Sequence, residues 1–146
     1  MFYEFSVTLL KGTSQANATI TECKLEKGII HRVEIQFPAG CHFLAKCQLK
    51  LKSLHQVWPK NTDGFFAGEF FPIVFDDYYP LKRPYIINWV AWNDDDTYQH
   101  QLKLRIGLLP EKDMPLTLRV SSALQQTAKI LTKWLSGEEE IPEVIE

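Results

Sequence analysis

The residues most able to do chemistry lie in one short stretch, residues 89–100, which reads WVAWNDDDTYQH. An asparagine and three consecutive aspartates follow an apolar run, and a histidine comes four residues after the last aspartate. Hard cations such as Ca²⁺ bind several carboxylate oxygens, so these aspartates and those of the segment VFDDYY could form an ion site. The candidate ion ligands are Asp76, Asp77, Asp94, Asp95 and Asp96.

The spacing of these aspartates argues against the ion site. The ligands of an EF-hand alternate along their loop around a central Gly and end at a distal Glu, and this stretch has neither feature. Asn and Asp accept turn conformations and hydrogen-bond their own backbone, and apolar-alternating runs flank the stretch on both sides. The sequence therefore predicts the turn of a β-hairpin, with no metal and no cofactor.

The remaining residues give little sign of catalysis. None of the four histidines, His31, His42, His55 and His100, has metal-ligand spacing. His31 and His100 fall on apolar strand faces, which predicts histidines in or near the core with a hydrogen-bond partner. Cys41 and His42 are not a dyad, because neighbours on a strand point to opposite faces. With no GxSxG, P-loop or dinucleotide glycine motif, the sequence predicts a protein that is not an enzyme.

The composition predicts one globular domain that does not bind nucleic acid directly. The chain has 146 residues, the length of a single domain, with 45% apolar residues and a net charge of -2. Nucleic-acid binding calls for a marked basic excess, which is lacking. No apolar segment approaches the ~18 residues needed to span a bilayer, so no membrane span is expected.

The cysteines and the N-terminus predict synthesis in a reducing cytoplasm. The three cysteines are odd in number and form no CxxC pair, which argues against a disulfide framework or a zinc ribbon. The first residues, MFYEFSVTLLKG, lack a basic leader and carry Glu4 and Ser6 within their apolar run. They are not predicted to be a signal peptide.

Strand periodicity dominates the first three-quarters of the chain. Alternation of apolar and polar residues, bounded by turn residues, predicts about eight strands. They lie in residues 2–10, 18–25, 29–37, 41–52, 55–58, the aromatic-rich 65–84, 85–92 and 98–109. Short strands without an alternating βαβ pattern predict a single antiparallel β-sandwich or a barrel.

The alternation also predicts which residues face the core. In residues 29–37, His31 shares a face with Val33 and Ile35. In residues 41–52, the polar face carries Lys46, Gln48, Lys50 and Lys52. Three lysines on one strand face could contact phosphate, but they more often form a solvated face, and the net charge favours the solvated face.

The C-terminal segment has helical periodicity. Ser122 and Gln125 form a capping-box pattern, and Gly137 is the expected stop. Leu124, Ala128, Leu131 and Leu135 lie along one stripe of the helix, flanked by Ile130 and Trp134. The predicted organisation is a β-sandwich over 1–120, an amphipathic helix over 121–137 and an acidic tail over 138–146.

Two runs carry a resemblance to known proteins. LEKGIIHRVEIQFPAGCHFLAKCQLKL and WNDDDTYQHQLKLRIGLLP resemble small β-sandwich proteins of virus and phage particles, and the likeness extends over residues 18–110. The resemblance lies in the spacing of the predicted strands and in the residues of the turns, not in an active-site motif. The resemblance implies a jelly-roll-like sandwich that builds or decorates a particle as an oligomer.

The leading functional hypothesis is a non-enzymatic structural subunit of a virus or phage particle, of capsid, decoration or spike type. It is expected to form a homo-oligomer and to contact other structural proteins, and to be incorporated into the virion after synthesis. Assembly is expected through the edges of the sandwich and a C-terminal arm. The predicted interface residues are Phe70, Phe71, Trp134, Leu135, Ile141, Val144 and Ile145.

A ligand-binding module is the alternative function. Aromatic side chains can form a platform for carbohydrate or for a surface receptor, although aromatic-rich strands more often form a core or an interface. The aromatic residues that motivate this alternative are Trp58, Trp89, Trp92, Tyr78, Tyr79, Tyr85 and Tyr98. Solvent-exposed Trp side chains near one loop end would favour this alternative.

Overall fold

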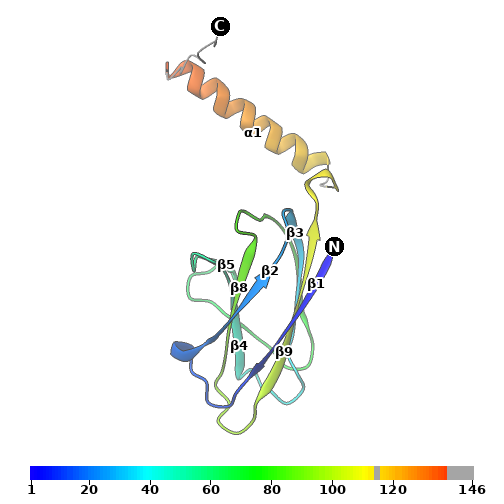
Figure 1. Cartoon of the computed structure of the whole chain (residues 1–146), viewed down its shortest axis with the longest axis vertical. Coiled ribbons are helices and arrows are strands. Elements are labelled where there is room, and N and C mark those ends of the chain that lie inside the picture. Colours follow the sequence, from blue (N-terminus) through cyan, green and yellow to red (C-terminus); the bar gives the residue numbers. More distant parts are fainter. Residues whose placement is uncertain (114–115, 138–146) are drawn as a thin grey trace. The chain divides into compact units, whose positions relative to one another are not determined.

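The computed structural model describes residues 1–113 and 116–137 of the chain. The chain divides into two compact units, Met1–Glu111 and Lys112–Glu146, and each is described by itself. The first unit is an antiparallel β-sandwich, and the second contains the helix α1 (Leu116–Leu135) (Figure 1). The predicted fold class, a β-sandwich with a C-terminal helix, is confirmed.

Within the described residues, nine strands form two sheets. The first sheet has the spatial order β1 (Phe2–Leu9), β9 (His100–Leu109), β3 (Ile29–Gln36), β7 (Ile73–Pro80). The second has the order β2 (Thr19–Lys24), β8 (Ile86–Asn93), β4 (Ala45–Leu51), β5 (Gln56–Trp58), and β6 (Phe66–Ala67) also pairs with β4. Two short 3₁₀ turns cover Gln15–Asn17 and Glu111–Asp113.

The order of pairing shows how the chain is wound. β1 pairs with β9, β2 with β8, β3 with β7, and β4 with β5, all antiparallel. Successive pairs alternate between the two sheets, as in a long antiparallel ribbon rolled up along its length. Pairing of β3 with β9 and of β4 with β8 then completes each sheet. This is the winding of an eight-stranded jelly roll, to which β6 is added.

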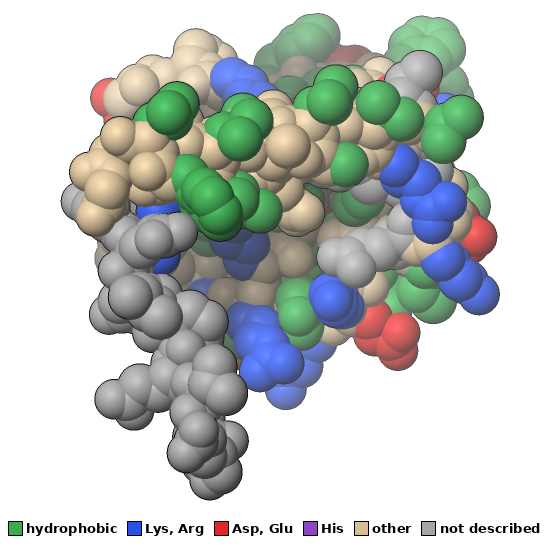
Figure 2. Space-filling view, turned by 90° about the horizontal axis from the view of Figure 1, so that it is seen from above, with side chains coloured by type: hydrophobic (Ala, Val, Ile, Leu, Met, Phe, Trp, Pro, Cys, Tyr) green, Lys and Arg blue, Asp and Glu red, His purple; other side chains and the backbone are tan. Residues whose placement is uncertain are grey.

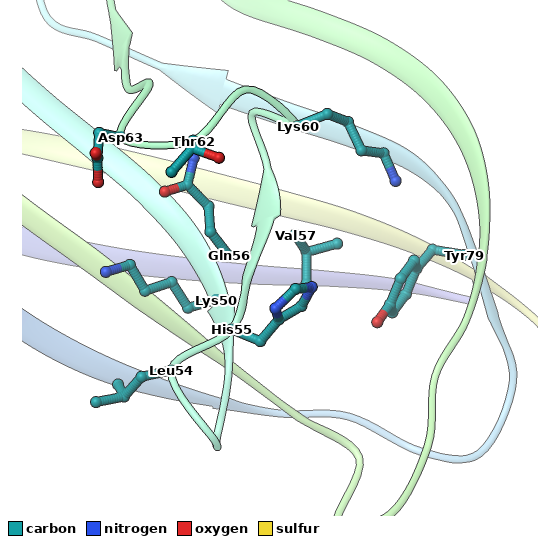
Figure 3. A pocket seen from close by; sticks show the side chains of 9 residues that line it. All are labelled: Lys50, Leu54, His55, Gln56, Val57, Lys60, Thr62, Asp63 and Tyr79. Atoms are coloured by element: carbon teal, nitrogen blue, oxygen red, sulfur yellow. The ribbon is translucent and has the colours of Figure 1, made fainter.

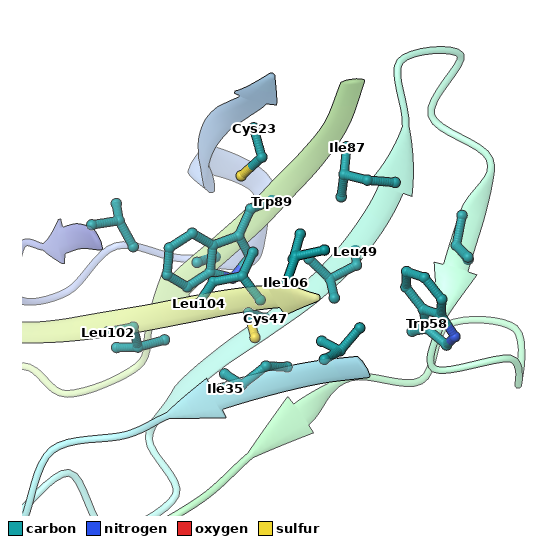
Figure 4. Packing of buried hydrophobic residues seen from close by; sticks show 14 of the residues in the cluster. Cys23, Ile35, Cys47, Leu49, Trp58, Ile87, Trp89, Leu102, Leu104 and Ile106 are labelled. Atoms are coloured by element: carbon teal, nitrogen blue, oxygen red, sulfur yellow. The ribbon is translucent and has the colours of Figure 1, made fainter. Parts of the chain in front are cut away.

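The core lies between the two sheets. Leu104 and Ile106 of β9 and Ile35 of β3 come from the first sheet, and Leu49 of β4 and Trp89 of β8 come from the second; all five are fully buried. Figure 4 shows the Trp89 ring among side chains from both sheets. The alternation that predicts these strands thus also fills the space between them.

A β-bulge in β3 changes the predicted faces of this strand. The register with both neighbouring strands shifts between Ile30 and Arg32, so Ile29 and Ile30 are both buried. His31 is turned out of the core and packs edge-on against the Phe2 ring, with 5.9 Å between the ring centroids. The prediction that His31 shares the core face is wrong, because an extra residue in a bulge reverses the alternation.

The outer face of β4 is less solvated than predicted. Gln48 is buried, and its side-chain amide donates a hydrogen bond of 2.7 Å to the carbonyl oxygen of Gly64. The Phe65 ring packs edge-on against Trp92 of the neighbouring strand β8, with 5.8 Å between centroids. The connection between β5 and β6 therefore covers part of this face, and Gln48 satisfies a backbone carbonyl of that connection.

The helix begins earlier than the predicted boundary at 121. It starts at Leu116, so Ser122 lies inside the helix and is not its N-cap. Pro115 precedes Leu116 in the sequence, and proline is a residue favoured at helix starts. At the other end the helix stops at Leu135, and Gly137 has a φ of +71°, as expected of a glycine that ends a helix.

Candidate functional site

The aspartate stretch connects two strands that belong to different sheets. β8 ends at Asn93 in the second sheet, and β9 begins at His100 in the first. The residues between them cross the space between the sheets, which is ~10 Å in a typical sandwich. The predicted β-hairpin is therefore wrong, although the prediction of a turn is right. Tyr98 precedes β9 and is exposed.

Asn93 and Asp95 hold this connection in place. The Asn93 side-chain amide donates to the carbonyl oxygen of Tyr98 at 2.9 Å, and its Oδ1 accepts the backbone N–H of Asp95 at 3.0 Å. Oδ1 of Asp95 accepts the backbone N–H of Thr97 at 2.8 Å and that of Tyr98 at 3.2 Å. These are the local side chain–backbone bonds that favour Asn and Asp in turns.

His100 and Asp95 form a buried pair at the start of β9. Oδ2 of Asp95 lies 2.8 Å from Nε2 of His100, and both residues are buried. The hydrogen bond from the Thr97 backbone, followed by that from His100, holds the pKa of the Asp95 carboxyl below its usual range. His100 thus has a hydrogen-bond partner, as predicted. This partner is Asp95, which also organises the connection between β8 and β9.

The other candidate ion ligands have separate partners. Asp94 bonds Lys46 at 2.8 Å, and Asp76 lies 3.5 Å from Arg32. Asp77 accepts the indole N–H of Trp58 at 2.9 Å. Among the residues that the structure describes, no group of three or more His, Cys, Asp or Glu side chains could hold a metal ion. Asp96 accepts the Thr97 hydroxyl at 2.9 Å, so each of the five aspartates has contacts of its own.

All three thiols are free and buried. Burial raises the pKa of Cys23 and of Cys47 to about 12, and it also raises the pKa of Cys41. The Cys41 thiol donates a hydrogen bond of 2.9 Å to the carbonyl oxygen of Gly68. A thiol that is protonated and buried is a poor nucleophile, so these cysteines are structural.

We expect none of the thiols to react with Ellman's reagent within minutes at pH 8 in the native protein. All three should react once the protein is unfolded in guanidinium chloride, because unfolding exposes them and restores an ordinary thiol pKa. The unfolded sample, reduced beforehand, is the control for the total count. Rapid reaction of one thiol in the native protein would contradict the burial described above.

A pocket of about 420 Å³ lies beside β5 (Figure 3). Its volume falls in the range of small-ligand sites, and its lining mixes charged, polar and apolar groups. The Lys60 ammonium lies over the rings of Trp58 and Tyr79, at 5.9 and 5.6 Å from the centroids, and 3.4 Å from Asp77. The lining residues are Lys50, Leu54, His55, Gln56, Val57, Lys60, Thr62, Asp63 and Tyr79.

The tryptophans of the sandwich form no exposed platform. Trp58, Trp89 and Trp92 are all buried, with at most 3% of each residue exposed. Trp58 packs against the rings of Phe75 and Tyr79, at 5.8 and 5.4 Å between centroids. These side chains stabilise the fold, and the condition that would favour a tryptophan-lined ligand site is not met on the sandwich.

The predicted interface residues that the structure describes are all exposed. Phe70 and Phe71 precede β7 and contact each other edge-on, with 5.2 Å between ring centroids. Trp134 and Leu135 end an exposed apolar stripe on α1, and Figure 2 shows hydrophobic side chains spaced along the helix. Ile141, Val144 and Ile145 lie outside the described residues, so these three stay predictions.

No protein-family model matches the sequence, and no curated protein matches it. In the described part of the chain, no helix is long and apolar enough to cross a membrane. Function is therefore inferred from the residues of this chain alone.

Proposed function

We propose that the chain is a non-enzymatic structural subunit of a virus or phage particle, of capsid, decoration or spike type, that assembles as an oligomer. The observation that carries the proposal is the jelly-roll winding of the two sheets, an architecture used by viral capsid domains. The same architecture also occurs in lectins and cupins, so the winding needs support from the surface of the molecule.

The surface of α1 supplies this support. Among the helix side chains that the structure describes, seven large apolar ones are exposed: Leu116, Val120, Leu124, Ile130, Leu131, Trp134 and Leu135. Apolar surface of this extent on one helix commonly marks a contact with another protein. A C-terminal arm that binds a neighbouring subunit buries this stripe and links the copies of an assembly.

The proposal predicts that the purified full chain has a solution mass several times its monomer mass of 16.9 kDa. Deleting residues 138–146, or replacing Trp134 and Leu135 together by serine, should lower the average mass in light scattering. Both changes should leave the sandwich folded, because neither alters a residue of the first unit. Electron microscopy of the same samples distinguishes closed shells from rings or fibres.

The matched control for this experiment replaces Gln125 and Gln126 by serine. These residues are exposed on the same helix but are polar, so the average mass should not change. A full chain that is monomeric at every concentration overturns the proposal. Normal assembly of both the truncated chain and the Trp134, Leu135 variant would exclude the arm as the contact.

The pocket of Figure 3 favours ligand binding as the second candidate function. Its amine, imidazole, amide and hydroxyl groups suit a polar ligand such as a carbohydrate. Trp58 reports on this pocket, since Lys60 and Tyr79 line the pocket and both contact the Trp58 ring. A monomeric chain whose tryptophan emission responds to a glycan, with the response lost in Trp58→Phe, would support this function over the first.

A further inference from the structure

Four loops of the sandwich meet at one end. They are residues 10–18, 37–44, 68–72 and 94–99, here called the four-loop end. The strand register places them together, because Leu9 pairs with His100 and Ala45 pairs with Asn93 at the ends of their strands. In Figure 1 this end lies at the bottom of the sandwich, away from the label N. It exposes Leu10, Phe43, Phe70, Phe71 and Tyr98.

The backbone of the four-loop end holds two of these phenylalanines in an unfavourable conformation. Phe43 and Phe70 have φ values of +61° and +59°, and His42, beside Phe43, has a φ of +47°. A residue with a Cβ rarely adopts this left-handed region, least of all a bulky one. Backbone strain of this kind persists where the surrounding structure enforces it, and it is commonly found at functional surfaces.

Glu69 enforces the conformation of two of the four loops. Its Oε1 accepts the backbone N–H of Gly40 at 2.6 Å, and its Oε2 accepts the backbone N–H of His42. These bonds, from Gly40 first and then from His42, lower the pKa of the Glu69 carboxyl. One side chain from the loop that carries Phe70 and Phe71 thus fixes the loop that carries Phe43.

Further bonds tie the remaining loops together. The backbone N–H of Gly12 donates to the carbonyl oxygen of Asp95 at 2.6 Å, and that of Asp94 donates to Leu44 at 2.9 Å. Leu10 and Tyr98, with Lys11, line one shallow hollow between their loops. The exposed apolar side chains are therefore presented on loops whose backbones are fixed before any partner binds, which reduces the entropic cost of binding.

The exposed apolar area lies at the upper end of the range for free monomers. Between 59% and 75% of each of the five residues is exposed. Taking roughly 200 Å² for a fully exposed large side chain, the five together expose about 600 Å². The largest apolar patches of monomeric proteins reach ~300–600 Å², and a standard protein interface buries ~800 Å² from each partner. The five side chains thus reach the upper limit for a free monomer and could supply most of one side of a standard interface.

The charges of the four-loop end favour a second copy over a charged partner. Asp94 is paired with Lys46, and Asp95 with His100. The other ionised groups of the four loops are one base, Lys11, and two acids, Glu69 and Asp96. An anionic membrane surface calls for a basic excess, which these loops do not have. These three groups sum to −1 on each face, and the presence of both signs lets Lys11 of one copy pair with Asp96 of the other.

We infer that the four-loop end is the face through which one copy of this chain contacts a second copy. This inference rests on the proposed oligomeric function and adds a contact distinct from the C-terminal arm. The phenylalanines of one copy pack against the same face of the next, and Lys11 of one copy faces Asp96 of the other. A contact between identical faces is self-complementary and relates the two copies by a two-fold axis.

The test replaces Phe70 by asparagine and Phe71 by serine in the full chain. Asparagine tolerates a left-handed backbone, so the fold of the loop is kept. Sedimentation equilibrium should show a dissociation constant at least about thirtyfold higher than that of the natural chain, the size expected for loss of a central aromatic anchor. Unchanged circular dichroism and melting temperature confirm that the variant is folded.

The matched control is Leu54→Asn, at the opposite end of the sandwich. Leu54 is likewise exposed and has a φ of +65°, so the substitution makes the same chemical change away from the proposed contact. Association of this variant should equal that of the natural chain. Gln99→Cys, in the four-loop end, should give a covalent dimer with a short bismaleimide, whereas Leu54→Cys should not. The native thiols are buried and do not compete.

The outcomes separate this inference from the proposed function. If the natural chain is an oligomer and Phe70→Asn with Phe71→Ser leaves its association unchanged, the four-loop contact is overturned and the structural function stands. If the natural chain is a monomer throughout, the structural function fails as well. If the monomer instead sediments with phosphatidylcholine vesicles and the double variant does not, the partner is a lipid surface and not a second copy.

Discussion

Replacing Trp89 by alanine is expected to lower the free energy of unfolding of the sandwich by about 3–5 kcal/mol. Trp89 lies at the centre of the core and is fully buried, and its ring fills the space between the two sheets (Figure 4). Truncation removes this buried apolar surface and leaves a cavity that the close-packed neighbours fill only in part. The free energy of unfolding of a typical domain is about 5–15 kcal/mol, so the variant loses much of its stability.

Urea unfolding followed by circular dichroism measures this loss as a shift of the midpoint. Trp89→Phe keeps most of the volume of the ring, so it should cost less and stay folded if the alanine variant does not. The indole N–H of Trp89 has no nitrogen or oxygen acceptor and lies beside the Cys47 thiol, a weak acceptor, so phenylalanine forfeits little. Trp134→Ala, in the exposed part of α1, is the control and should not move the midpoint. A midpoint unchanged in Trp89→Ala contradicts the described core.

The positions of the strands could be predicted from the sequence because each sheet has one face exposed to solvent and one face buried in the core. In β9, Leu102, Leu104 and Ile106 face the core and alternate with lysine and arginine, so the period of two is visible. The bulge in β3 could not be predicted, since Ile29 and Ile30 are equally apolar and either could face the core. Periodicity identifies a strand but not an inserted residue.

The strand order likewise had no signal in the alternation. The connection between β8 and β9 has the residue types of a hairpin turn, but its neighbouring strands pair with β2, β4, β1 and β3 rather than with each other. Turn chemistry describes how a chain bends locally, whereas the sheet that the next strand joins depends on contacts far along the chain. The alternation therefore leaves the strand order open, and the jelly-roll winding is visible only in the strand pairing.

The candidate surfaces could be predicted only in part. Phe70 and Phe71 stand out because they directly precede Pro72 in an aromatic-rich segment. Nothing in the sequence marks Phe43 as an exposed side chain, because it falls at an apolar position of the strand predicted over residues 41–52. Phe43 has a left-handed backbone, and the backbone N–H of its neighbour His42 is bonded by Glu69, which is 27 positions from His42 in the sequence. Such long-range carboxylate–backbone bonds leave no local pattern.

Neither could the sequence distinguish Asp95 from its neighbours. Asp94, Asp95 and Asp96 have the same side chain, yet Asp94 and Asp96 are exposed and Asp95 is buried against His100. The difference arises because the connection crosses between the sheets and turns one side chain of the three inward. The structure therefore gives one of three chemically equivalent aspartates a distinct physical role.

Asp95→Asn is expected to lower the melting temperature near pH 7 by about 5 °C, because a buried hydrogen-bonded group loses its charge-assisted bond. Asparagine keeps the shape of aspartate and an oxygen that can accept the backbone N–H groups of Thr97 and Tyr98. It replaces the second, anionic oxygen, which bonds His100, by an amide. The variant therefore isolates the contribution of the charge at this position.

The pH dependence of that difference gives the sharper test. The hydrogen bonds hold the pKa of Asp95 in the folded protein below its value in the unfolded chain, which is ~4. Ionised Asp95 thus contributes stability in full above pH ~4, and this contribution is lost as the pH falls through the lower pKa of the folded state. The gap in melting temperature between the natural chain and Asp95→Asn should therefore shrink as the pH falls below 4.

Asp96→Asn is the matched control, since Asp96 is the exposed neighbour and bonds only the Thr97 hydroxyl among the described contacts. Its melting curves should follow those of the natural chain throughout this range. If the gap between Asp95→Asn and the natural chain stays constant down to pH 2, the buried oxygen acts by shape and not by charge. If Asp96→Asn shows the shrinking gap instead, the inward-facing aspartate is the wrong one of the three.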